Sequence, residues 1–266
     1  MLDKFGKFSL SYHEIFNYPL TANEMTRWTP GRIPNGYKCD KKAIFKNGYW
    51  FFEGKTSLVS KLMKRHQNST KKMKIARKAS KILSYIPMVK LVAVTGSLAM
   101  RNTSENGDID LFIIAENGRL WTTRLSVYLI LKIFGFSLRR PGSQTQKDKL
   151  CLNMWMEESD MVWKNPRNIY TAHEIAQIIS LVNKNKVYEK FLFKNRWILD
   201  FWPNAVRIVN CKSENSFHRI SFIEKIAFKF QYSYMKNKMS REVVTPTRAI
   251  FHPLDWGKIV LAKLNI

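Results

Sequence analysis

The spacing of apolar residues along the chain changes character near residue 90. Over 55–86, apolar residues recur at helical intervals, which predicts one or two amphipathic helices there. Beyond that point, short β-branched runs predict buried strands at KLVAVTGS, DIDLFIIA and KLCLNMWM. The run GRLWTTRLSVYLILKIFG, between the second and third of these strands, predicts a helix. This order of elements predicts an α+β fold in which helices cover a mixed sheet.

The first 54 residues have the pattern of a small module of two helices and a hairpin. FSLSYHEIFN favours a short helix, and Thr21 with Glu24 forms a capping-box pattern at the start of a second one. Asn47-Gly48 between two apolar runs predicts a type I′ hairpin. This order resembles a winged-helix module. The interval TPGRIPNGYKCDKK, with two prolines and two glycines, is poor material for a recognition helix, so a packing or docking role is preferred over DNA reading.

Beyond residue 160 the pattern predicts helices to the end of the chain. YTAHEIAQIISLVN opens with a second capping-box pattern, from Thr171 to Glu174. YEKFLFKNRWILDFW and FIEKIAFKFQYSYMK predict amphipathic helices that are rich in aromatic residues. Such aromatic stripes are usually core, although they are also able to stack on a nucleobase.

The charge of the chain indicates a polyanionic partner. It has 45 Lys and Arg against 20 Asp and Glu, a formal net charge of +25, which suits nucleic acid, nucleotide phosphates or an anionic membrane surface. The dominance of Lys over Arg also fits a merely Lys-rich proteome. No acidic residue occurs between Glu53 and Glu105, so the helical segment there is either a solvated basic surface or a wall of a phosphate-binding groove.

Cysteines and apolar stretches indicate a compartment. The three cysteines are widely spaced and odd in number, which favours a reducing, cytoplasmic setting over a disulfide framework or a cysteine zinc site. The first residues lack the apolar core of a signal peptide. The stretch SVYLILKIFGF is interrupted by Lys132 and is too short to span a bilayer, so no transmembrane segment is expected.

Candidate chemistry gathers in GSLAMRNTSENGDIDLFIIA, at 96–115. Strand alternation places Asp108 and Asp110 on one face, where two close carboxylates repel each other unless a cation neutralises them. Mg²⁺ shared with a phosphate ligand fits this arrangement. Gly96 lets the backbone approach a ligand closely, and the amides and hydroxyl at Ser97 are donors for phosphate oxygens. A phosphate cradle beside metal-binding carboxylates is what phosphoryl or nucleotidyl transfer requires.

At these residues the chain resembles the nucleotidyltransferase superfamily that includes DNA polymerase beta. The signature of that superfamily is Gly-Ser at a strand end, a gap, and Asp-x-Asp or Asp-x-Glu on the next strand. The whole arrangement looks like bacterial nucleotidyltransferase-domain proteins with a winged-helix-like N-terminus and a helical C-terminus. The resemblance implies that Gly96 and Ser97 bind a nucleoside triphosphate, and that Asp108 and Asp110 are catalytic carboxylates holding Mg²⁺ or Mn²⁺.

With that resemblance, the patterns divide the chain into four parts. These are a winged-helix-like module at 1–54, a basic connecting helix or helices at 55–87, a nucleotidyltransferase core at 88–160 and a helical C-terminal domain at 161–266.

The third predicted strand departs from the pattern of this superfamily. Active members usually carry a third acidic residue there, whereas the corresponding place holds Asn153, whose amide oxygen can ligate a metal but cannot take a proton. Glu157 shares its strand parity but lies about 13 Å further along. His173 and Glu174 are alternative bases, although a helix start with a satisfied cap explains both more simply. The remaining alternatives are that metal coordination replaces a strong base, or that the site binds nucleotide without turnover.

Several arginines are candidates for phosphate binding, because the planar guanidinium suits phosphate oxygens. Arg101 closely follows the Gly-Ser turn and is expected to contact phosphate with it. Arg124 is a weaker candidate at the helix after the aspartates. The others nearby are Arg119, Arg139 and Arg140.

The sequence therefore predicts a metal-dependent nucleotidyltransferase that moves a nucleoside monophosphate from an NTP to a hydroxyl and releases pyrophosphate. The acceptor is RNA, a protein or a small molecule, and the basic charge favours RNA or another polyanion. The alternative, favoured by Asn153, is a nucleotide- or nucleic-acid-binding protein on an inactive core of this kind. A third interpretation is an adaptor with a protein partner.

Overall fold

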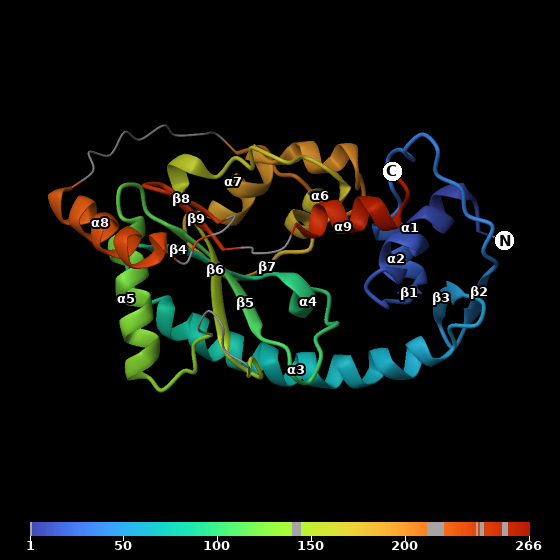
Figure 1. Ribbon diagram of the computed structural model, residues 1–266, viewed down its shortest axis with the longest axis horizontal. Helices are drawn as coiled ribbons and strands as arrows, with labels where there is room; N and C mark the ends of the chain where they lie inside the picture. Colours follow the sequence, from blue (N-terminus) through green and yellow to red (C-terminus); the bar gives the residue numbers. More distant parts are fainter. Residues whose placement is uncertain (1, 140–144, 212–220, 238, 240–241, 252–254) are drawn as a thin grey trace.

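The computed structural model describes residues 2–139, 145–211, 221–237, 239, 242–251 and 255–266. Within these residues the protein is a mixed α+β structure with a small sheet and a larger one. Figure 1 shows the small sheet at one end, the large sheet at the other, and the long helix α3 running beneath both. The α+β prediction is confirmed at this level.

The N-terminal part contains the predicted helices and hairpin. Its elements are α1 (Lys4–Glu14), β1 (Leu20–Thr21), α2 (Ala22–Arg27), β2 (Ala43–Lys46) and β3 (Tyr49–Phe52). The predicted capping box is present, since the Thr21 hydroxyl accepts from the Glu24 amide and the Glu24 carboxylate accepts from the Thr21 amide. Asn47 and Gly48 have φ values of 53° and 82°, as a type I′ turn requires. Residues 28–42 contain no helix, so the interval lacks a recognition helix.

The basic segment forms one continuous helix, α3 (Ser57–Leu83). Its buried side includes Leu62, Ala76 and Ala79, and most of its lysines face solvent. Lys72 is the exception. This buried ammonium donates to the carbonyls of Glu105 and Gly107 at 3.0 and 2.8 Å and pairs with Asp148 at 2.6 Å. The helix thereby anchors the loop that leads into Asp108.

The large sheet has the strand order β7-β4-β5-β6-β9-β8. The central strands β4 (Val89–Val94), β5 (Ile109–Ala115) and β6 (Leu150–Glu157) coincide with the three predicted strands. β4 and β5 are antiparallel, whereas β5 and β6 are parallel and connected through α5 (Leu120–Ile133), so the sheet is mixed as expected. Two short segments, α4 (Gly96–Ala99) and the 3-10 helix η1 (Glu158–Asp160), follow β4 and β6.

Each face of the large sheet supports its own hydrophobic core. On one face, Val92, Leu111 and Ile113 pack with residues of α3, α5 and α8 (Phe222–Lys236). On the other face, Leu91 and Phe112 pack with residues of the N-terminal part, α6 (Ile169–Ala176), α7 (Val187–Lys194), the 3-10 helix η2 (Arg196–Asp200) and α9 (Trp256–Lys263). Asp108 and Asp110 share strand parity with Phe112 and therefore open towards the second face.

The prediction that residues 161–266 are entirely helical is wrong. β7 (Ile179–Asn183) pairs with β4, while β8 (Val243–Thr245) and β9 (Arg248–Ile250) extend the other edge from β6. These short segments are strands because they pair with the edges of β4 and β6. The backbone hydrogen bonds gained by this pairing outweigh the local helical propensity.

The predicted capping box from Thr171 to Glu174 is also wrong. Helix α6 begins three residues earlier, with Asn168 as the N-cap and Thr171 in the reciprocal position. The carboxylate of Glu174 instead accepts a hydrogen bond from Gln177 at 2.6 Å. Glu174 therefore has no role in capping α6.

Among the described residues, no helix combines the length and the apolar character needed to cross a membrane.

Candidate functional site

Gly96 and Asp110 lie against each other because β4 and β5 are neighbouring antiparallel strands. The chain leaves β4 at Thr95, whose amide donates to the Asp110 carbonyl at 3.1 Å. Gly96 has a φ of 59°, in the left-handed region that favours glycine. A Cβ atom at this position would lie 2.8 Å from Oδ2 of Asp110. Both the turn and the space for the carboxylate therefore require glycine.

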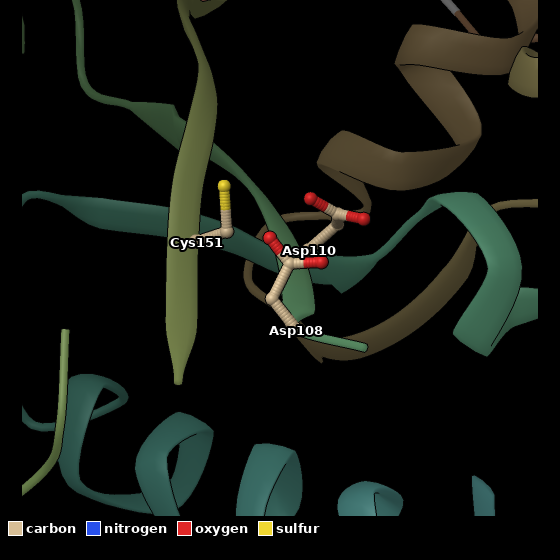
Figure 2. A group of neighbouring side chains, drawn as sticks. All are labelled: Asp108, Asp110 and Cys151. Carbon is tan, nitrogen blue, oxygen red and sulfur yellow. The ribbon is translucent and has the colours of Figure 1, made fainter. Parts of the chain in front are cut away.

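Asp108 and Asp110 form a pair of carboxylates at the start of β5, facing Cys151 on β6 (Figure 2). The ligand atoms of the three side chains lie within 4.8 Å of one another. Burial, and then the charge of Asp108, raise the pKa of Asp110 from 3.8 to about 7. Two close carboxylates need a neighbouring positive charge to ionise together, as the sequence predicted. Arg139 supplies part of this charge, because its guanidinium donates to Oδ2 of Asp108 at 2.7 Å.

Cys151 and Asn153 share one face of β6 and both lie beside the carboxylate of Asp110, next to a bulge in the strand. The register with β5 shifts between Asp110, which pairs with Cys151, and Phe112, which pairs with Met154. Such a bulge redirects side chains beside it. The amide nitrogen of Asn153 donates to Oδ1 of Asp110 at 2.7 Å, which confirms that Asn153 stands beside the aspartates.

The donor set fits a hard divalent cation. The carboxylates of Asp108 and Asp110 carry charge that Arg139 offsets only in part, and the Oδ1 atom of Asn153 is buried without a hydrogen-bond partner. Carboxylate and amide oxygens are the ligands that Mg²⁺ and Mn²⁺ prefer. Burial and the two carboxylates raise the pKa of the Cys151 thiol, so it stays neutral and is a poor ligand for such ions.

A cavity of about 550 Å³ opens beside this pair. Gly96, Ser97 and Arg139 line it on the side of the carboxylates. The opposite walls come from three other places in the chain: the end of α1, the helix α6 and the helix α9. Phe16 and Trp256, from the first and last of these, are in ring contact at 6.3 Å. The N-terminal part thus helps to form the cavity.

Glu174 supplies a third carboxyl group to the cavity, from α6 rather than from the sheet. Burial, and then the charge of Asp110, raise the pKa of Glu174 from 4.5 to about 8. Asp110 lines the same cavity, so the two carboxyl groups lie in one site. The sequence named Glu174 only as an alternative base, because the T-x-x-E spacing was attributed to a helix cap that the structure assigns to Asn168.

The contacts of His173 indicate that it has a structural role. Its ring stacks on Trp28 with a centroid distance of 3.9 Å, and its Nε2 lies 3.2 Å from Nε2 of His13. Burial lowers the pKa of His13 to about 4 and that of His173 well below its usual value, so both rings are neutral near pH 7. The pair connects α1 to α6 across the cavity wall.

Ser97 and Arg101 differ in their relation to the site. Ser97 is exposed to the cavity, and its hydroxyl lies 2.7 Å from that of Thr103. Arg101 is exposed with a φ of 54° and is not among the residues that line the cavity. Arg139, which the sequence ranked no higher than its neighbours, is the arginine that contacts an aspartate.

The structure places Arg124 and Glu157 away from the aspartates. Arg124 lies between Trp121, Tyr128 and Phe251 and donates to Gln231 at 2.6 Å, which joins α5 to α8. Glu157 is buried at the far end of β6, opposite Ala115, and accepts from the Leu120 amide at the start of α5.

The other sequence candidates are also placed outside the site or in the core. Arg119 is exposed before α5, and Arg140 lies outside the described residues. Among the aromatics considered for base stacking, Phe191 and Trp202 are fully buried in the core.

Comparisons with known proteins give no assignment. No family model matches the chain, and no curated protein matches it. The functional argument therefore rests on the geometry of the cavity and its carboxylates.

Proposed function

We propose that the protein is a metal-dependent nucleotidyltransferase that moves a nucleoside monophosphate from an NTP to a hydroxyl acceptor and releases pyrophosphate. One observation carries the proposal: the carboxylate of Asp110, which is paired with that of Asp108, lies directly against Gly96, and a side chain at this position would leave no room for it. Nucleotidyl transfer needs a turn that admits phosphate close to metal-binding carboxylates. The resemblance to the polymerase beta-like superfamily rests on the same residues.

The residues of the chain have separate roles in this proposal. Asp108, Asp110 and the free amide oxygen of Asn153 would hold Mg²⁺ or Mn²⁺, which would offset the charge of the phosphates and of the attacking oxygen. Gly96 and Ser97 line the same cavity, and their backbone amides and the Ser97 hydroxyl would donate to the triphosphate. Arg139 adds a guanidinium to this side and orients Asp108.

Glu174 is the proposed proton acceptor for the hydroxyl that attacks. It lines the cavity, and burial and the charge of Asp110 raise its pKa to about 8 in the absence of added positive charge. A cation bound beside Asp110 lowers that value, because it favours the ionised carboxylate. The missing acid of β6 is then replaced by a residue from α6.

A second candidate function is nucleotide binding without turnover. Asn153 favours it, because an amide stands where a carboxylate would complete the set on the three strands. In this case the cavity would bind an NTP with its metal, and Glu174 would have no chemical role. A protein adaptor would require neither nucleotide binding nor nucleotidyl transfer.

Label transfer distinguishes these functions. The protein is incubated with each α-labelled NTP, Mg²⁺ or Mn²⁺, and total RNA or cell lysate as acceptors, beside the variant Asp108→Asn/Asp110→Asn. An Asp40→Asn variant is the matched control, since Asp40 is an exposed carboxylate outside the cavity. Transfer by the parent and control proteins, but not by the double variant, is expected. Metal-dependent NTP binding without transfer would favour the second function. The absence of both NTP binding and transfer would refute both functions.

A further inference from the structure

Helix α8 presents an exposed apolar stripe at the end of the molecule opposite the N-terminal sheet (Figure 1). Its members are between 51% and 77% exposed and recur at helical spacing; they are Phe222, Ile223, Ile226, Phe230 and Tyr234. The opposite side of the helix is buried, and Glu224, Ala227 and Gln231 attach it to α5. Large apolar side chains gathered in this way mark an interaction surface.

The neighbouring helix α5 adds further apolar residues. Leu125, Leu129 and Ile133, which follow one another at four-residue intervals, are between 42% and 69% exposed. Phe228 of α8 packs on Trp121 of α5 with a ring distance of 5.0 Å, so the two helices form one unit. We call the exposed residues of α5 and α8 together the α5–α8 surface.

The charges on the α5–α8 surface are all positive. Lys132, Lys225, Lys229 and Lys236 are exposed on the two helices. The sequence of α5 contains no acid, and the single acid of α8, Glu224, is buried. Its carboxylate accepts from the amides of Trp121 and Thr122 at 2.5 and 3.0 Å, at the start of α5. No carboxylate on these helices therefore opposes an anionic partner.

We propose that the α5–α8 surface binds peripherally to an anionic lipid bilayer. Aromatic and branched side chains beside lysines, on a helix that lies flat, are suited to the boundary between headgroups and acyl chains. The net charge of +25 attracts the whole molecule to a negative surface. The same charge opposes a second copy, because two α5–α8 surfaces would bring their lysines together.

This function is independent of the nucleotidyltransferase proposal. The α5–α8 surface shares no residue with the cavity, so binding to vesicles does not require the carboxylates. An Asp108→Asn/Asp110→Asn variant is therefore expected to bind vesicles as the parent protein does.

Vesicle flotation tests the proposal with two matched pairs of variants. Vesicles of equal parts phosphatidylserine and phosphatidylcholine are compared with vesicles of phosphatidylcholine alone, at low and high salt. Ile226→Ser/Phe230→Ser removes two apolar residues of the stripe, and Phe45→Ser changes an exposed apolar residue of the N-terminal hairpin. Lys225→Gln/Lys229→Gln is compared with Lys61→Gln/Lys64→Gln on α3, where both lysines are also exposed. Circular dichroism confirms that each variant is folded.

The expected result is flotation with phosphatidylserine vesicles that weakens with salt and is absent with phosphatidylcholine alone. Loss of the two α8 lysines lowers the partition coefficient about fivefold per lysine, and loss of Ile226 and Phe230 lowers it at least about tenfold. The proposal is overturned if the parent protein does not float, or if the α3 and Phe45 variants lose as much as the α8 variants. It is also overturned if sedimentation shows a dimer that Ile226→Ser/Phe230→Ser dissociates, because a second copy then covers the surface.

Discussion

Replacing Asp110 by Asn is expected to stabilise the metal-free protein. The folded state raises the pKa of this carboxyl from 3.8 to about 7, which means that folding opposes its ionisation. The difference corresponds to about 4 kcal/mol at a pH above both values. Asp110 lines a cavity and is only half-buried, so solvent reduces the effect, and about 2–4 kcal/mol is expected. Asparagine has the same shape and carries no charge.

The sign of this effect fixes its pH dependence. A carboxyl whose pKa is raised on folding stabilises the folded state at low pH, and that stabilisation is lost as the pH rises from about 4 to about 7. The advantage of Asp110→Asn over the parent is therefore largest at pH 8, less than about half as large at pH 5, and absent below about pH 4. Removing the charge of Asp110 also lowers the pKa of Glu174, so the difference between the two proteins reports Asp110 together with its effect on Glu174.

Urea unfolding in EDTA at pH 8 and pH 5 measures the free energy of unfolding of the parent, Asp110→Asn and the exposed control Asp40→Asn. Addition of Mn²⁺ is then expected to stabilise the parent and the control but not Asp110→Asn, since only an ion bound to the folded state shifts the equilibrium. If Asp110→Asn is less stable than the parent at pH 8 in EDTA, folding does not oppose the ionisation of Asp110 as its raised pKa requires. If Mn²⁺ stabilises all three proteins equally, the ion binds elsewhere.

Three further changes test other parts of the structure. Gly96→Ala would place Cβ 2.8 Å from Oδ2 of Asp110 in a left-handed backbone conformation, so a loss of about 1–2 kcal/mol in urea unfolding and of the Mn²⁺-induced shift is expected; an unchanged shift would argue against the close approach. Lys72→Met removes the ammonium that donates to the Glu105 and Gly107 carbonyls and pairs with Asp148, and about 1–3 kcal/mol of stability is expected to be lost; a change under about 0.5 kcal/mol would show that the loop is not anchored there. Arg139→Gln removes the cation beside Asp108 and is expected to weaken NTP binding at least about tenfold, measured by fluorescence titration with a labelled NTP; unchanged affinity would place the phosphates elsewhere.

The central strands and the aspartate pair were predictable from the sequence because local pattern determines them. β4, β5 and β6 are predominantly apolar, and such runs form strands that are covered on both faces. Asp108 and Asp110 share a face by simple alternation. Gly96 was expected to admit a ligand, and the structure shows in addition that its missing side chain leaves room for Oδ2 of Asp110.

The rest of the site depends on tertiary contacts that local pattern does not encode. Glu174 lies at the cavity on a helix whose N-cap is Asn168, whereas the T-x-x-E spacing favoured a later start. The position of Asn153 followed from strand alternation, whereas the bulge beside it, which shifts the register of β6 against β5, is signalled by no residue of that strand. The strand β7 forms because it pairs with β4, and β9 because it pairs with β6.

The most direct test of the proposed function compares two labels on one nucleotide. The protein is incubated with its preferred NTP, labelled either on the α-phosphorus or on the γ-phosphorus, together with Mg²⁺ and the acceptor fraction. Nucleotidyl transfer predicts that the acceptor gains the α-label, that the γ-label is released as pyrophosphate, and that Asp108→Asn/Asp110→Asn abolishes both. Transfer of the γ-label to the acceptor, or incorporation of the α-label that survives in the double variant, would contradict the assignment of these carboxylates to nucleotidyl transfer.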